Sequence, residues 1–309
     1  MHDNYIDIDS ISELHRFYGY DKPKHPLITI IDQKEVNYDN RPRQGQLYRL
    51  GLYSVFYKRI KGSLIYGRST YDYNEGSLIF TAPHQVMAPA TAVPPDEGWG
   101  LFFHPDLVAG TELGKKINQY SFFHYDSNEA LHPSEDERTI IKNAAGNIAK
   151  EYEQKIDRHT EYLLIANLDL LIGYCHRFYD RQFFTRATVN KDVVQQFERL
   201  LNDYFEGAAI ETGLPDVKYF AASLHLSPNY LSDLLKKYTG KTTQEHIHLQ
   251  LIDRAKSLLW GSEKPVSEIA YQLGFEHPSH FTKIFRTKTG KSPTAFRHPD
   301  QKDRGRGES

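Results

Sequence analysis

Two stretches near the C-terminus carry side chains that can hydrogen-bond to base edges and phosphates. They combine amide, hydroxyl, imidazole, carboxylate and cationic groups: Asn229, Tyr230, Ser232, Asp233, Lys236 and Lys237 in the first stretch, and Ser279, His280, Thr282, Lys283 and Arg286 in the second. Such groups near the start of a helix are suited to enter the major groove of a DNA duplex. The residue types therefore indicate contact with double-stranded DNA.

The two stretches belong to an internal repeat. Apolar residues that follow Val217 recur at the same spacing after Val266, an offset of 49, whereas Pro228 to Lys241 matches Pro278 to Lys291 at an offset of 50. The offset grows by one inside the unit, which places a single inserted residue in a tight turn. A repeat of this kind predicts a duplicated helix–turn–helix.

The second helix of each copy has an inward apolar stripe and defined ends. The stripe falls at i, i+3 and i+4 in both copies: Leu231, Leu234 and Leu235, then Phe281, Ile284 and Phe285. Ser227 is predicted to cap the first of these helices, and a glycine to end each. Between the copies, Thr243 to Trp260 lacks Gly and Pro and predicts a helix of roughly 27 Å. Recognition helices at its two ends could meet successive major-groove faces about 34 Å apart.

These residues resemble the AraC/XylS family of bacterial transcription regulators. The resemblance rests on Leu226-Ser227-Pro228-Asn229-Tyr230-Leu231, on Ile269-Ala270-Tyr271-Gln272-Leu273-Gly274-Phe275, and on Phe281-x-x-x-Phe285-x-x-x-x-Gly290-x-x-Pro293. It implies base contacts from Asn229, Ser232 and Asp233 and from Ser279, Thr282 and Lys283. Asp233 stands where the family often has Arg or Gln, and it either accepts from cytosine or spaces the helix from the DNA backbone. The resemblance also implies contact with RNA polymerase.

The N-terminal part predicts a small β domain. A short helix over Ser10 to Phe17 is followed by runs rich in β-branched and aromatic residues: Leu27–Ile31, Leu47–Ile60, Ser63–Tyr73, Gly76–Phe80 and Trp99–Phe103. Short runs at such intervals favour an antiparallel barrel or sandwich. By resemblance it is a cupin-like barrel that senses a small molecule. The fold class is then α+β, with a sensor and dimerisation domain at 1–181 (barrel about 20–130, helices about 135–178), a linker at 182–190, a double helix-turn-helix domain at 191–298 and a disordered tail at 299–309.

Ligand-binding residues in the first domain are less sharply indicated. Arg49, Arg59, Arg68 and His84 either line a pocket for an anionic effector or are solvated or paired on the outside. The first 130 residues hold no His-x-His pair of the kind a cupin metal site uses, so we expect no metal, no cofactor and no catalytic residue. His246 and His248 form such a pair in sequence, but on a helix they point about 200° apart.

Two helices are predicted between the barrel and the linker. Ser134-x-x-Glu137 is a capping box that opens the first, and the second starts near Thr160 and is apolar nearly all round. An apolar surface that wide is buried on more than one side. Residues 135–178 therefore either form a homodimer interface or are buried wholly within one subunit.

Charge and composition fit a DNA-binding regulator. The stretch from Asp216 to Arg306 has 15 Lys and Arg against 9 Asp and Glu, a net of +6, which leaves −8 for the rest of a chain whose total is −2. The single cysteine, Cys175, excludes an intrachain disulfide, and no apolar run indicates a signal peptide or a membrane span. We expect a cytoplasmic regulator, with activation favoured over repression. The alternatives are a barrel-domain metalloenzyme and an architectural DNA binder without a ligand, although no P-loop, nucleophile elbow or His-Glu-x-x-His is present.

Overall fold

Two compact units, Met1–Arg186 and Ala187–Ser309, make up the protein. The computed structural model describes residues 6–32, 47–59, 63–66, 69–72, 76–87, 97–126, 129–185, 187–206 and 213–298. Arg68 and the tail predicted to be disordered, 299–309, lie outside these ranges. Among the described residues, no helix has both the length and the apolar character needed to cross a membrane.

The first unit is built on β-strands with a mainly antiparallel arrangement. A four-stranded sheet has the order β2 (Ile28–Asp32), β9 (Glu97–Phe103), β4 (Tyr53–Arg59) and β7 (Ser77–Thr81), and every neighbouring pair is antiparallel. A three-stranded sheet has the order β1 (Ile6–Ile8), β3 (Tyr48–Leu50) and β8 (Val86–Met87), and a separate hairpin joins β5 (Ser63–Tyr66) to β6 (Ser69–Asp72). The strands β2 to β7 and β9 fall largely within the β-rich runs predicted from the sequence, whereas β1 and β8 lie outside all of them.

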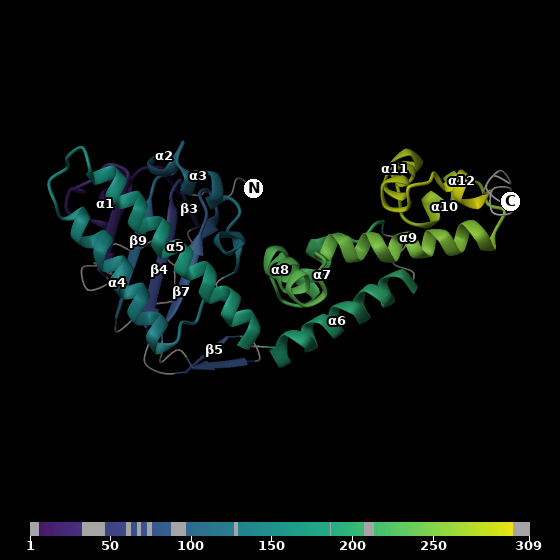
Figure 1. The fold of residues 1–309 in the computed structure, drawn as a ribbon, viewed down its shortest axis with the longest axis horizontal. Helices are drawn as coiled ribbons and strands as arrows, with labels where there is room; N and C mark the ends of the chain where they lie inside the picture. The colour runs from purple at the N-terminus through teal and green to yellow at the C-terminus, as the bar shows by residue number, and fades with distance from the viewer. Residues whose placement is uncertain are drawn as a thin grey trace, which may run out of the picture. The chain divides into compact units, whose positions relative to one another are not determined.

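Each face of the four-stranded sheet packs against a different partner. Phe56 and Phe102 point to a core cluster that includes residues of β1, β3 and the helix α1 (Ile11–Tyr18). Tyr57 and Trp99 alternate with them along the strands and so lie on the opposite face. That face is covered by α4 (Glu135–Tyr152) and α5 (Thr160–Thr185), which run side by side across the sheet (Figure 1).

The helices of this unit begin and end where their sequences specify. Ser10 caps α1, which stops at Gly19 with φ of 71°. The predicted capping box of α4 is confirmed, since Ser134 accepts from the Glu137 amide and Glu137 bonds back to the Ser134 amide. Three shorter helices connect the sheet to α4: α2 (Pro105–Val108), α3 (Glu112–Ile117) and the 3₁₀ helix η4 (Ser121–His124).

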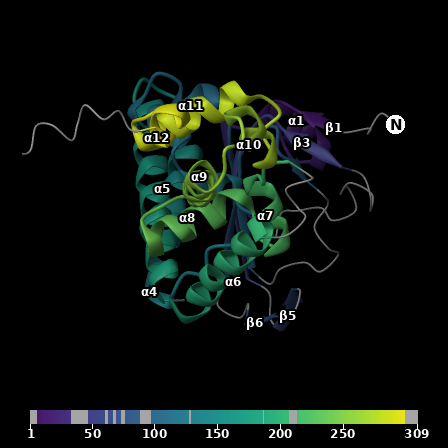
Figure 2. The ribbon, with the colours of Figure 1, turned by 90° about the vertical axis from the view of Figure 1, so that its right-hand side faces the viewer.

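The second unit is helical throughout its described residues. Its elements are α6 (Ala187–Glu206), α7 (Val217–Ser223), α8 (Pro228–Thr239), α9 (Thr243–Gly261), α10 (Val266–Gln272), α11 (Pro278–Thr289) and α12 (Pro293–Arg297). Figure 2 looks along α9, which carries α7 and α8 on one side and α10 to α12 on the other. The fold class is thus a mixed helix-and-sheet unit followed by an all-helical one.

The segment predicted as a linker, 182–190, differs from that expectation. Residues 182–185 are the last turn of α5, and 187–190 are the first turn of α6. The physical reason is that the end of α5 is anchored: Gln182 is buried, its side chain accepts from the His132 amide at 2.7 Å, and it donates to the Ala130 carbonyl at 3.1 Å. A polar–aromatic composition without clear periodicity concealed these helical turns.

Candidate nucleic-acid interface

The duplication predicted from the sequence is repeated in the backbone. The helices α7 and α10 both have 7 residues, and α8 and α11 both have 12. The connecting turn runs from Leu224 to Ser227 in the first copy and from Leu273 to His277 in the second, one residue longer. The predicted single insertion in a tight turn is confirmed.

Both turns use the same backbone hydrogen bond and the same left-handed residue. The Leu226 amide donates to the Ala221 carbonyl at 2.9 Å, and the equivalent bond from Phe275 to Ala270 is 3.0 Å. The central residue has φ of 56° at His225 and 87° at Gly274. This geometry fixes the direction in which α8 leaves α7, and α11 leaves α10.

The C-terminal ends of the two second helices are also built alike. Gly240 and Gly290 both adopt φ of 76°, and each donates its amide to a carbonyl four residues back. The hydroxyls of the preceding threonines, Thr239 and Thr289, donate to the carbonyls of Leu235 and Phe285 at 2.7 and 2.8 Å. Each helix therefore ends in the same orientation relative to the chain that follows it.

A continuous apolar core holds the two copies on α9. The predicted stripes point inward: Leu231, Leu234, Leu235, Phe281 and Phe285 are 0% exposed, and Ile284 packs partly buried against the core. The helix α9 contributes five apolar residues to the same core, namely Ile247, Leu251, Ile252, Ala255 and Leu259. The predicted connecting helix is confirmed, and at 19 residues it spans about 28 Å.

The arrangement around α9 differs from the expected recognition helix at each end. Lys288, in the last turn of α11, acts on two residues near the start of α9. Hydrogen bonds from Thr242, and then Lys288, lower the pKa of Glu245, while burial raises it; burial, and then Lys288, lower the pKa of His248. The far end of α9 is occupied by α12 instead, where Trp260 stacks on Phe296 with ring centroids 5.0 Å apart. The helix α12 folds back along α9, which was not visible in the sequence pattern.

Most of the predicted contact residues lie on the outer faces. The side chains of seven are exposed: Asn229, Lys236, Lys237, Ser279, His280, Lys283 and Arg286. Three others are half-buried and already bonded within the protein: the Ser232 hydroxyl bonds Thr243 at 3.1 Å, the Thr282 hydroxyl donates to the Pro278 carbonyl at 3.0 Å, and Asp233 has an interaction within the chain. These three are less available than their positions in the sequence suggested.

Tyr230 requires a correction. It is 7% exposed and belongs to the buried set of α8, so its side chain is not presented on the outer face. Its backbone amide has a structural role, because it donates to the Ser227 hydroxyl at 3.2 Å and completes the N-terminal cap of α8. Tyr230 precedes the Leu231 stripe by one residue, and the sequence pattern alone placed it outside the core.

Two exposed cations were not among the predicted contacts. Lys241 and Lys291 directly follow the helix-ending glycines and are exposed in both copies. Each is fixed by the same bond, from its backbone amide to the preceding threonine hydroxyl at 3.3 Å. The signal was present in the sequence, since Thr-Gly-Lys occurs in both copies at the offset of 50.

The predicted effector residues that the structure describes lie in two places: Arg49 and His84 both act on Asp7, and Arg59 belongs to a different site. Arg49 makes two bonds to Asp7, at 2.7 and 2.9 Å, and so closes β1 onto β3. His84 is an exposed turn residue with φ of 63°. Arg59, in contrast, lines a recess between the four-stranded sheet and α4. Arg49 therefore has a structural role in its ion pair with Asp7, and Arg59 belongs to a separate site.

The chain is similar to known proteins. Residues 220–298 match a family described as a helix-turn-helix domain. The chain is 26% identical over 231 residues to the uncharacterized HTH-type transcriptional regulator YijO of Escherichia coli, covering 72% of this chain and 78% of the relative. It is 28% identical over 134 residues to the transcriptional activator RhaS of Salmonella newport, covering 43% and 46%. The DNA-binding domain of AdpA, solved with a target DNA, has 26% identity, covers 38% of this chain and 97% of that domain, and gives a TM-score of 0.29.

The duplicated unit and these relatives define a helix-turn-helix transcriptional regulator. Residues 220–298 form a helix-turn-helix domain of the AraC type, and the chain is similar to transcriptional regulators of the AraC/XylS family.

Proposed function

We propose that the protein binds specific promoter or operator sequences through α8 and α11 and activates transcription in response to a small molecule. The observation that carries the DNA-binding part is the matched pair of helices, each with exposed polar residues and a basic C-terminal turn, on one rigid core. Exposed Lys236, Lys237, Arg286 and Lys288 would bind phosphates and make affinity fall with salt. The exposed Asn229, Ser279 and Lys283 would select bases.

Substitution of Lys283 tests this assignment. Lys283→Ala should weaken binding to the selected operator by about 1–3 kcal/mol, with a smaller effect on random duplex, because a base contact adds specificity. Lys256→Ala is the matched control, since Lys256 lies on α9 and its ammonium already pairs with Asp253 at 3.3 Å. Fluorescence anisotropy with labelled duplexes measures both. Equal affinity of Lys283→Ala and the parent for the operator would remove α11 from base selection.

Small-molecule control is assigned to the first unit. Two sheets and α1 enclose a common apolar cluster, which supports a cupin-like barrel as the sensor. The family resemblance supports ligand-dependent regulation, with RNA polymerase as the partner on the promoter and the cytoplasm as the compartment. This assignment would be supported by a metabolite that changes the operator affinity of the full chain but leaves the operator affinity of the isolated second unit unchanged.

A homodimer is proposed through the helices of the first unit. The exposed face of α5 carries Tyr162, Leu163 and Leu170, with 72%, 40% and 48% of their surfaces exposed. Large apolar side chains along one helix face favour contact with a second copy. Light scattering at micromolar concentration should give the mass of two chains, and Leu170→Glu should shift it to one. A parent mass of one chain would contradict the dimer.

A further inference from the structure

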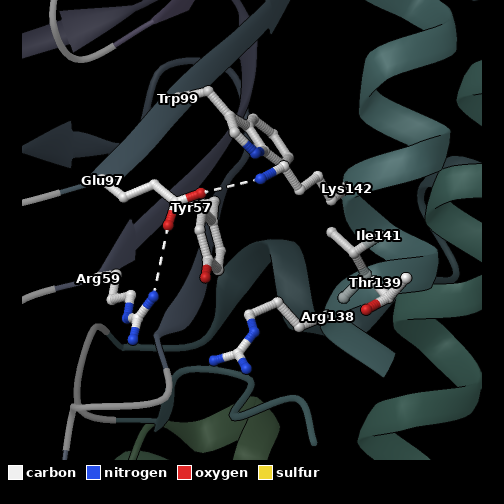
Figure 3. Close-up of a pocket in the computed structure, with 8 residues that line it drawn as sticks. All are labelled: Tyr57, Arg59, Glu97, Trp99, Arg138, Thr139, Ile141 and Lys142. Carbon is white, nitrogen blue, oxygen red and sulfur yellow. Dashed lines mark hydrogen bonds and ion pairs between the residues drawn. The ribbon is translucent and has the colours of Figure 1, made fainter. Parts of the chain in front are cut away.

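A recess between the four-stranded sheet and α4 has the features of a binding site. Its lining comes from β4, β9 and the first two turns of α4, and its volume is about 210 Å³. The eight lining residues, drawn in Figure 3, are Tyr57, Arg59, Glu97, Trp99, Arg138, Thr139, Ile141 and Lys142. The recess lies on the face opposite the Phe56 and Phe102 cluster, and so outside the space between the two sheets.

The buried hydroxyl of Tyr57 lies in this recess, and the Arg138 guanidinium acts on it. Tyr57 is 4% exposed, and its hydroxyl makes no hydrogen bond of normal geometry within the described residues. Gly76 packs so closely that a Cβ atom there would lie 2.6 Å from this oxygen, so nothing larger can approach from that side. A buried polar group without a bond costs free energy, which a ligand that bonds it would recover.

The charge around Tyr57 is predominantly positive. Burial raises the pKa of its hydroxyl, and Glu97 adds to this, while the Arg138 and Arg59 guanidinium groups act in the opposite direction. Glu97 is the single carboxylate in the lining, and it is bound by Arg59 at 3.6 Å and by Lys142 at 3.3 Å. Arg138 is 22% exposed, has a long 3.8 Å contact to Glu135, and points toward the hydroxyl end of Tyr57 (Figure 3).

The apolar part of the lining limits the ligand further. The Tyr57 and Trp99 rings stack with centroids 6.0 Å apart and an interplanar angle of 25°, and Ile141 faces them from α4. The recess is smaller than the roughly 300–1,000 Å³ of sites that hold drug-sized ligands. We propose that it binds a small carboxylate, with Arg138 and Tyr57 on the oxygens and an apolar body against Trp99.

Arg138 also links the recess to the C-terminal end of α5, because it is the sequence neighbour of Glu137. The next residue toward the N-terminus, Glu137, closes the capping box of α4 and accepts two bonds from Arg181 of α5, at 3.0 and 2.6 Å. Arg181 lies four residues before α5 ends at Thr185, and it also donates to the His132 carbonyl at 2.9 Å. Occupancy of the recess thus biases the end of α5 that leads into α6. This consequence rests on the effector control proposed above.

Indole spectra of the full chain test the site directly. The protein has two tryptophans, and Trp260 in the second unit serves as an internal control for Trp99. Acetate, butyrate and benzoate are titrated, with benzamide as the neutral analogue of benzoate and inorganic phosphate as a second anion. A carboxylate should shift the ¹H–¹⁵N signal of Trp99 and leave that of Trp260. No shift with any carboxylate, an equal shift with benzamide, or a shift with phosphate alone would overturn the carboxylate assignment.

Three variants separate recognition from folding. Arg138→Gln should weaken the carboxylate about tenfold or more, because a charged bond is lost. Lys150→Gln, which removes an exposed charge about three turns after Arg138 along α4, should leave affinity unchanged. Tyr57→Phe should weaken binding while thermal stability stays equal or rises, since the lost hydroxyl makes no hydrogen bond of normal geometry among the described residues. Unchanged affinity in both Arg138→Gln and Tyr57→Phe would overturn the site.

Failure of this site and failure of the regulator can be told apart. Arg181→Lys keeps the charge but loses the paired bonds to Glu137, so it should retain the Trp99 shift and lose the carboxylate-dependent change in DNA affinity. A retained change in DNA affinity would overturn the route through Glu137. Without ligand, Arg138→Gln should bind DNA as the parent does. A parent that selects no DNA sequence would instead refute the proposed regulation and leave the Trp99 result standing.

Discussion

The two helix-turn-helix copies use one backbone plan with different side chains at two of its key positions. The left-handed turn residue is His225 in the first copy and Gly274 in the second. Only the second turn is crowded, because a Cβ atom on Gly274 would lie 2.8 Å from the carbonyl carbon of Gly213. The comparison shows that the duplicated backbone does not by itself demand glycine there. In the second copy, the backbone of Gly213 lies so close that only glycine fits at position 274.

The N-terminal caps of the recognition helices differ in the same way. In the first copy the Ser227 side chain accepts from the Tyr230 amide, whereas in the second His277 occupies the cap position and makes no such bond. The inserted residue lies in this turn and displaces the position that Ser227 fills in the first copy. The first helix start is therefore held by a side chain, and the second mainly by its turn and core contacts.

The largest predicted effect comes from the crowded turn. Gly274→Ala should destabilise the second unit by about 2–5 kcal/mol, because it combines a positive φ with a backbone clash. The matched change in the first copy, His225→Gly, should alter stability by no more than about 1 kcal/mol. Urea unfolding followed by Trp260 fluorescence in a Trp99→Phe background measures both. Similar losses in the two variants would show that the copies are equivalent after all.

The cap difference predicts a smaller asymmetry. Ser227→Ala should cost about 1 kcal/mol, since the Tyr230 amide loses its acceptor at a buried position. His277→Ala should change the free energy of unfolding by less than about 0.5 kcal/mol, because the histidine makes no cap bond. The same urea experiment applies. A larger loss for His277→Ala than for Ser227→Ala would reverse the interpretation.

The smallest effect is the pH dependence that His246 contributes through its contact with the first copy. Burial, and then Lys241, lower the pKa of His246, which bonds Thr239 at 2.7 Å, while Glu198 and Glu245 oppose them. Because the pKa of His246 is lower in the folded chain, the unfolded chain binds more protons. The contribution of His246 to folding stability is therefore complete above the ordinary histidine pKa of 6.5, and it is lost as pH falls through the lower pKa of the folded state. The equivalent position in the second copy is Phe296, which does not titrate.

His246→Gln should therefore reduce the loss of stability between neutral and mildly acidic solution. The pKa of His248 is also lowered by burial, and by Lys288 and His280, so part of the pH dependence should remain. Urea midpoints at one pH above 6.5 and one below it provide the comparison. An unchanged pH dependence in the variant would assign the whole effect to other groups.

Features with a local cause could be predicted from the sequence. The stripes of α8 and α11, the capping box at Ser134 and the glycine ends each depend on residues a few positions apart, and all are present in the structure. Most strands of the first unit were likewise foreseeable from β-rich runs separated by glycines, although β1 and β8 were not predicted. Periodicity and capping act over one or two turns, so a single sequence carries enough information.

Features set by distant contacts could not be predicted. The Arg49 pairing with Asp7 depends on the parallel register of β1 with β3, which no local pattern encodes. The recess combines Tyr57, Trp99 and Arg138 from three elements, and only the packing of α4 on the sheet brings them together. Tyr230 was misplaced because one helix position decides between core and surface, and the core on α9 extends around α8 further than a three-residue stripe indicates.

Selection of bound sequences from a random duplex pool, at two salt concentrations, tests the central claim that both copies contact specific bases. The account predicts enrichment of a site with two short conserved blocks about ten base pairs apart, one for α8 and one for α11. Substitution of Lys283 should erase one block and leave the other. Enrichment of a single block, or salt-sensitive binding without any enriched sequence, would contradict the account.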